Sequence, residues 1–140
     1  MRLVIMNDTY CNSPPLAPIV LFVYNRLSHT KKTIESLQKN KLAIDSNLFI
    51  YSDYAKNKGS EKGVKEVRDY ISRVNGFKNV TVIFRDKNLG LAESIMDGVT
   101  SIVNRYGKVI VLEDDIVTSP FFLKFMNEAL DYYKESNKVW

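Results

Sequence analysis

Three consecutive carboxylates, Glu113, Asp114 and Asp115, follow the apolar run "VIVL" in the segment "VIVLEDDIVTSPFF" (109–122). Neighbouring carboxylates repel one another, so such a cluster at the end of a buried strand calls for a positive partner. A hard divalent cation, Mg²⁺ or Mn²⁺, suits this role because it prefers oxygen ligands and completes its shell with water and phosphate. The segment therefore predicts a metal-bound diphosphate. The alternative is a solvated loop whose acidic residues favour the N-terminus of the next helix.

The directions of the three side chains refine this prediction. Side chains alternate along an extended segment, which sends Glu113 and Asp115 to one side and Asp114 to the other. One or two of the carboxylates can then face the metal while a neighbour binds a sugar hydroxyl.

Strands and helices alternate along the chain and must position these carboxylates. A continuous apolar run that finishes in polar residues predicts a strand at 18–25, and mainly apolar runs predict further strands at 47–53, 79–86 and 108–115. Helical spacing of apolar residues predicts helices that begin near Ser28, at Ser60, after the turn "KNLG" and at Ser119. This order predicts an α/β fold: an open, mainly parallel sheet of about four strands with helices on both faces, a Rossmann-like arrangement.

The last two helices carry broad apolar stripes that predict their core faces. The stripe of the third helix comprises Leu91, Ala92, Ile95, Met96, Val99, Ile102 and Val103. The stripe of the fourth comprises Phe121, Phe122, Phe125, Met126 and Leu130. Three aromatic residues near the end of the chain are expected to pack rather than to form a sugar platform: Tyr132, Tyr133 and Trp140.

The strand ends predict where a ligand binds. Open α/β sheets bind ligands outside the carboxyl ends of their strands. Those ends read "YNR" (24–26), "SD" (52–53), "RDKN" (85–88) and "EDD" (113–115). All four are polar and one is strongly acidic, so the four predicted strand ends converge on one site.

Composition narrows the class of protein. The formal charge of +4 is spread from Arg2 to Lys138 without the dense basic patch that nucleic-acid binding needs. The single cysteine, Cys11, excludes an internal disulfide and favours a reducing compartment.

No stretch approaches the ~20 apolar residues of a transmembrane segment. We expect a cytoplasmic location, with a peripheral position at the membrane as an option. Residues 1–16 read as a Pro-rich N-terminal arm before a domain at 17–140.

Four motifs in this order resemble the nucleotide-sugar-binding half of GT-A-fold glycosyltransferases. The motifs are "APIVLFVYNR" followed by "TIESL", then "YSD", then "NLGLAESIMDGV", and finally "VIVLEDDIVTSPFF". The pattern is most similar to family 2 enzymes and to the N-acetylglucosaminyltransferase I type, in which Glu-Asp-Asp precedes a Pro and a Phe pair. The resemblance covers roughly residues 17–140. It implies an enzyme that binds a nucleotide sugar, expected to be a UDP-sugar, through Mn²⁺ or Mg²⁺.

The resemblance also implies a role for each matching residue. The loop after the first strand, which would wrap the base and reach toward the phosphates, matches Tyr24, Asn25 and Arg26. The carboxylate that accepts a hydrogen bond from uracil matches Asp53, and the turn that opens the third helix matches Asn88, Gly90 and Leu91. Asp115 matches the metal ligand. Glu113 and Asp114 match the groups that hold ribose and donor-sugar hydroxyls.

The resemblance leaves the acceptor side unassigned. GT-A domains of these families usually exceed 200 residues, so we expect a C-terminally truncated half-domain whose catalytic base lies beyond residue 140. A glycan or lipid-linked acceptor would bind there, and this chain alone is expected to bind metal and nucleotide with weak or absent transfer. A sheet edge exposed by truncation could promote self-association. Two alternatives stay open: a nucleotidyltransferase, which the glycine-free "YNRLSH" disfavours, and a non-catalytic interaction domain with the same fold.

Overall fold

The computed structural model describes residues 14–138, which form one parallel sheet flanked by helices. The strands are β1 (Ile19–Val23), β2 (Asn47–Ser52), β3 (Asn79–Phe84) and β4 (Ile110–Glu113), in the order β3-β2-β1-β4. All three strand pairings are parallel. The helices are α1 (Leu27–Gln38), α2 (Lys58–Ile71), α3 (Leu91–Tyr106) and α4 (Phe122–Tyr133), with a 3₁₀ turn, η1 (Ala43–Asp45). The predicted α/β fold with an open parallel sheet is confirmed.

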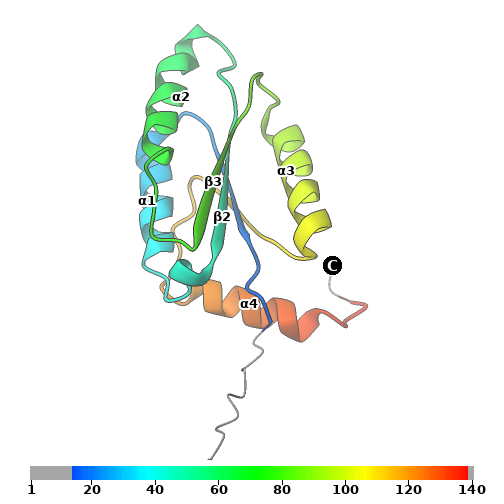
Figure 1. Ribbon diagram of the computed structural model, residues 1–140. Helices are drawn as coiled ribbons and strands as arrows, with labels where there is room; N and C mark the ends of the chain where they lie inside the picture. Colours follow the sequence, from blue (N-terminus) through cyan, green and yellow to red (C-terminus); the bar gives the residue numbers. More distant parts are fainter. Residues whose placement is uncertain (1–13, 139–140) are drawn as a thin grey trace, which may run out of the picture.

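Helices cover both faces of the sheet. Figure 1 shows α1 and α2 along one face and α3 along the other. The central strand β1 packs against both layers, because Leu21 belongs to the core beneath α1 and α2 while Val20 and Phe22 belong to the core beneath α3. All five β1 residues are buried, which explains the continuous apolar run in the sequence.

The last helix, α4, packs at the end of the sheet where the strands begin. The N–H of Leu123 donates to the side-chain oxygen of Asn40 at 3.0 Å, and the N–H of Ala17 donates to the side-chain oxygen of Asn127 at 2.8 Å. In Figure 1, α4 crosses the bottom of the molecule while the loops after β2 and β3 lie at the top. The carboxyl ends of the strands are therefore free of α4.

Two helix starts differ from the predictions. The second helix begins at Lys58 with Asn57 as its N-cap, and Ser60 occupies the third helical position, where the two side chains form a reciprocal capping box. The fourth helix begins at Phe122 instead of in the first turn after Ser119. The backbone oxygen of Ser119 accepts the N–H of Phe122 in a turn that precedes the helix.

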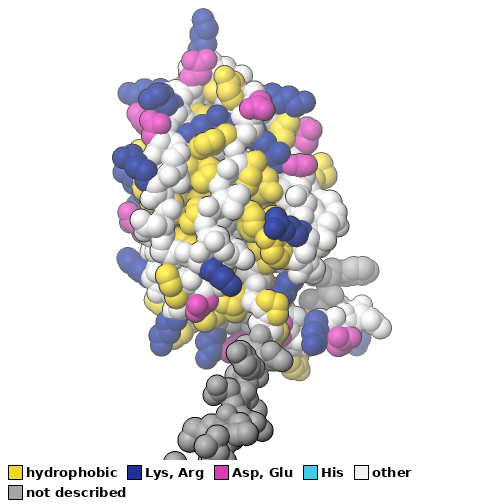
Figure 2. Space-filling model, viewed as in Figure 1, with side chains coloured by type: hydrophobic (Ala, Val, Ile, Leu, Met, Phe, Trp, Pro, Cys, Tyr) yellow, Lys and Arg dark blue, Asp and Glu magenta, His cyan; other side chains and the backbone are white. Residues whose placement is uncertain are grey.

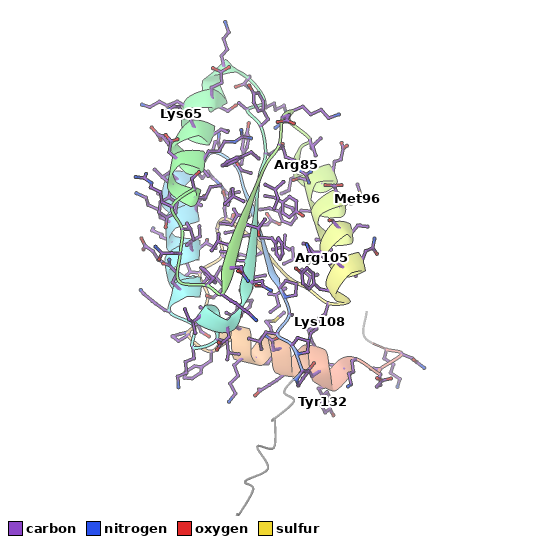
Figure 3. The ribbon with its side chains drawn as sticks, viewed as in Figure 1. Lys65, Arg85, Met96, Arg105, Lys108 and Tyr132 are labelled. Carbon is purple, nitrogen blue, oxygen red and sulfur yellow. The ribbon has the colours of Figure 1, made fainter. Side chains whose placement is uncertain are left out.

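The predicted core faces of α3 and α4 were partly wrong. Met96 is 64% exposed and Phe125 is 67% exposed, whereas Leu123, absent from the predicted stripe, is fully buried. The face of α4 that meets the core is centred on Leu123, which leaves Phe125 on the outer flank. Tyr132 was expected to pack but is 80% exposed. Figure 3 shows Met96 and Tyr132 on the outer sides of their helices. Trp140 lies outside the described residues.

The edge strands of the described sheet are β3 and β4. Figure 2 shows hydrophobic side chains gathered over β3, between α2 and α3, with Lys and Arg side chains around them. Phe84 at the end of β3 is 44% exposed. Self-association through an edge stays a prediction.

Among residues 14–138, none of the helices combines the length and apolar character that crossing a bilayer would need. Residues 1–13 of the predicted arm lie outside the described residues.

Candidate functional site

A cavity of about 340 Å³ opens where the strands end. Its volume falls within the range of small-molecule sites. The loops after all four strands contribute to its wall. The residues that line it are Phe22, Val23, Tyr24, Arg26, Asp53, Lys56, Asn88, Gly90, Leu91, Ser94, Glu113 and Asp114. The convergence of the four strand ends, predicted from the sequence, is therefore present in the fold.

Most of the residues singled out from the sequence line this cavity, but Asn25 and Asp115 are not in its wall. Two polar residues of the wall were missed, Lys56 and Ser94. Each had a signal in the sequence. Lys56 is a basic residue in the polar loop after the second strand, three residues after Asp53. Ser94 follows Gly90 by about one helical turn, so it lies on the same side of the third helix as Gly90.

The positive partner of the acidic triplet in this structure is Arg26. Its Nη2 donates to Oδ1 of Asp114 at 2.5 Å and to Oδ2 of Asp115 at 3.2 Å. Arg26 immediately precedes α1, and its carbonyl accepts the N–H groups of His29 and Thr30 in the first turn. The pKa of Arg26 is raised by its hydrogen bond to Asp114 and by the charge of that carboxylate, with smaller contributions from Asp115. The guanidinium therefore stays charged.

Asp114 combines burial with an unused acceptor. It is 4% exposed, and its backbone oxygen accepts the hydroxyl of Thr33 on α1 at 3.0 Å. Its Oδ2 is buried and accepts no hydrogen bond from the described residues. Leaving a buried acceptor unpaired costs about 1–3 kcal/mol, so the burial of this oxygen is unfavourable for the fold.

The strict alternation expected for the triplet does not hold. Strand β4 ends at Glu113, and Asp114 and Asp115 form a turn. As a result Glu113 and Asp114 both line the cavity, while Asp115 is an exposed residue beside Arg26. Within residues 14–138, no three His, Cys, Asp or Glu side chains are grouped closely enough to hold a metal ion by themselves.

Asp53 joins the loop after β2 to the loop after β3. Its Oδ1 accepts the N–H groups of Tyr54 at 2.8 Å and of Leu89 at 3.0 Å. Its Oδ2 accepts the N–H of Gly90 at 2.9 Å and the side-chain Nδ2 of Asn88 at 3.0 Å. Gly90 has φ +76°, which favours glycine, and α3 begins at the next residue.

The loop after β1 is fixed by close contacts with the loop after β2 and with α2. The hydroxyl of Tyr24 accepts the N–H of Lys56 at 3.0 Å. Asn25 packs against Gly63 of α2, where an added Cβ would lie 2.7 Å from the Asn25 carbonyl oxygen. Only glycine permits this approach of loop and helix. Asn25 therefore contributes to the position of Tyr24 and Arg26 rather than to the cavity wall.

Two arginines hold the strand ends from outside the cavity. Nη2 of Arg68 on α2 donates to the carbonyl oxygens of Ser52 (3.2 Å), Asp53 (3.3 Å) and Arg85 (2.8 Å), which joins β2 to β3. Arg85 lies over the ring of Tyr51 and forms an ion pair with Asp97 on α3. Figure 3 shows Arg85 beside the upper part of α3. Both guanidinium groups thus bind within the fold, although Nε of Arg85 is buried without an acceptor among the described residues.

The completed wall offers acceptors and cations together. Glu113 can accept hydroxyl groups, whereas Arg26 and Lys56 can neutralise an anion. The apolar side chains of Phe22, Val23 and Leu91 supply surface for a flat ring. A polar, anionic ligand with hydroxyl groups and an aromatic part matches this set.

Comparison with solved structures finds a similar fold in a glycosyltransferase, S. aureus TarS. The TM-score is 0.59 at 13% sequence identity, over 85% of this chain and 20% of the TarS chain. At this identity the likeness shows the fold alone. No protein-family model matches the sequence, and no curated protein matches it either.

Proposed function

We propose that this chain is the donor-binding part of a GT-A glycosyltransferase, of the family 2 or N-acetylglucosaminyltransferase I-like kind, that binds a UDP-sugar with Mn²⁺ or Mg²⁺. The observation that carries the proposal is the cavity at the carboxyl edge of the sheet, whose wall combines Glu113 and Asp114 with Arg26 and Lys56. A nucleotide sugar presents sugar hydroxyls, a diphosphate and a flat base, which are the groups that this wall is equipped to bind. The glycosyltransferase-like fold agrees with this assignment.

The residues present are compatible with a divalent cation. Asp115 is exposed beside the cavity, and of its carboxylate oxygens only Oδ2 bonds to Arg26. Mg²⁺-type sites commonly use one or two protein carboxylates and take their other ligands from water and substrate phosphate, so a preformed cluster of three acidic side chains is not required. Asp115 would hold the ion. When bound, the metal would stabilise negative charge on the departing diphosphate.

The roles of the chain's own residues follow from their positions. Arg26, the N-cap of α1, forms ion pairs with Asp114 and Asp115 and supplies a positive charge near the phosphates. Glu113 and Asp114, which both line the cavity, bind hydroxyls of the ribose and of the donor hexose or N-acetylhexosamine. Tyr24 and Leu91 flank the base. Among residues 14–138 we assign no general base for the acceptor hydroxyl and no binding site for the glycan or lipid-linked acceptor.

Calorimetric titration of UDP into the purified chain, with and without Mn²⁺, tests this function. Binding is expected only when Mn²⁺ is present, because the diphosphate supplies the ligands that complete the metal shell. A parallel titration with GDP measures whether the site distinguishes uracil from guanine. A folded chain, verified by circular dichroism, that binds no nucleoside diphosphate in either condition would refute the donor-site assignment.

A further inference from the structure

The carboxylate of Asp53 has no unused acceptor position. An ionised carboxylate offers about four lone-pair sites. Four N–H donors already occupy them, two on each oxygen, at distances between 2.8 and 3.0 Å. Asp53 is also 8% exposed, so little of it is open to a ligand. To accept a hydrogen bond from a base, the carboxylate would first have to release one of these donors.

Three of the four donors belong to one segment, Asn88–Leu89–Gly90, which lies about 35 residues further along the chain. The N–H groups of Leu89 and Gly90 have no other acceptor among the described residues. Asn88 adds a second tie through its Nδ2, which donates to the backbone oxygen of Tyr54 at 2.7 Å. The position of this segment is therefore determined mainly by Asp53.

The same segment sets where α3 begins. Gly90 is the N-cap of α3 at φ +76°, and no side chain caps the helix there. Gly90, Leu91 and Ser94 form the α3 side of the cavity wall. An added Cβ on Gly90 would meet nothing within 4 Å, so lack of space does not explain the glycine. Glycine is favoured here by its positive φ, and the hydrogen bonds to Asp53 hold the backbone in this conformation.

We propose that Asp53 is a positioning residue that shapes the α3 wall of the nucleotide cavity through Leu89 and Gly90, and that it does not select the base. This inference rests on the proposed function, since it concerns nucleotide binding in the same cavity. It assigns to Asp53 a different role from the uracil contact that the family resemblance implies. Base selectivity then belongs to other groups of the wall.

The substitution Asp53→Asn tests the proposal because it preserves shape and removes acceptors. In either orientation of the new amide, two of the four N–H donors would face an NH₂ group instead of an oxygen. In the ligand-free chain, the amide hydrogens of Leu89 and Gly90 are expected to exchange at least about 10-fold faster, as loss of a charged acceptor implies. Asp86→Asn is the matched control, since Asp86 is an exposed carboxylate in the same loop and lies outside the cavity wall.

Nucleotide binding supplies the second readout. With Mn²⁺ present, Asp53→Asn is expected to weaken UDP and GDP by the same factor, about 10-fold, so that the ratio of their affinities is unchanged. A ratio that falls to one while GDP affinity stays constant would show that Asp53 reads the base, and it would overturn the proposal. Unchanged exchange at Leu89 and Gly90 would overturn it as well.

The two readouts separate this inference from the proposed function. If the wild-type chain binds neither nucleotide, the proposed function fails, whereas the exchange measurement still decides whether Asp53 holds the loop. Should Asp53→Asn not fold, Asn88→Ala removes one donor of the set and its tie to Tyr54. It is expected to accelerate exchange at Gly90 and to leave the ratio of UDP to GDP affinity unchanged; a changed ratio would contradict the proposal.

Discussion

Asp115→Ala is expected to abolish Mn²⁺-dependent UDP binding while leaving the fold intact. Even residues that only orient a metal ligand cost about 10–100-fold in affinity when they are removed, so loss of the ligand itself should cost at least about 100-fold. The effect on stability should be small. Asp115 is exposed and its ion pair with Arg26 is solvated, which limits the pair to about 0–1 kcal/mol. Calorimetry and urea denaturation measure the two effects on the same variant.

Asp86→Ala is the control for this substitution. Asp86 is also an exposed carboxylate at the carboxyl edge of the sheet, and it is not part of the cavity wall. Its removal changes the net charge by the same amount and should leave UDP affinity within about twofold, as expected for an exposed residue that does not line the cavity. Equal UDP affinity in wild type and Asp115→Ala would refute the assignment of the metal to Asp115.

Arg68→Met is expected to lower the free energy of unfolding by about 2–4 kcal/mol, because two carbonyl oxygens, of Asp53 and Arg85, lose the only donor found for them among the described residues. Methionine keeps an apolar stem over the rings of Tyr54 and Phe84, which Arg68 covers at 5.5 and 5.0 Å. The substitution therefore keeps the apolar contact and removes the hydrogen bonds together with the two cation–π contacts of the guanidinium. Urea denaturation monitored by circular dichroism gives the change directly.

Arg73→Met is the matched control, since Arg73 is an exposed arginine just after α2 whose Nε donates to the carbonyl of Asp69. Its effect should stay within about 0.5 kcal/mol. A loss of less than about 1 kcal/mol for Arg68→Met would mean that water replaces the guanidinium at the strand ends. The association of β2 with β3 at their carboxyl ends would then depend on the backbone hydrogen bonds of the sheet alone.

The strands could be predicted from the sequence because each is a short, mainly apolar run followed by polar residues. Ile19–Val23 is buried on both faces, and its short length and β-branched residues favour a strand over a helix. The parallel arrangement followed from the alternation of strands and helices. The run of apolar residues overstates strand length, since the strand predicted at 108–115 pairs only over Ile110–Glu113.

Helix faces and helix starts were harder to predict because they depend on what the helix meets. The face of α4 that packs on the core is set by Asn40 at the end of α1, which accepts the N–H of Leu123 across 83 positions of sequence. Periodicity alone favoured Phe121 and Phe125, which lie on the adjacent exposed flank. The capping pair Asn57 and Ser60 shows the same limit, since either residue has the chemistry of an N-cap.

At the site, the sequence identified residue types and the structure supplied their partners. The acidic triplet correctly marked a need for positive charge, but the guanidinium that meets it comes from Arg26, 88 positions away from Asp114. Asp53 was singled out as a carboxylate at a strand end. Its four donors could not be foreseen, because three of them lie in a loop that reaches it only when β2 and β3 pair.

NMR spectroscopy of the ¹⁵N-labelled chain, titrated with UDP and then with Mn²⁺, tests the central claim most directly. The account predicts that UDP, in the presence of a diamagnetic Mg²⁺, shifts the amide signals of Tyr24, Gly90 and Leu91. Mn²⁺ should then broaden signals around Asp115 most strongly. Signals from α4, at the opposite end of the sheet, should remain unchanged. Shifts centred on α4, or no shifts at saturating UDP, would contradict a donor site at the carboxyl edge of this sheet.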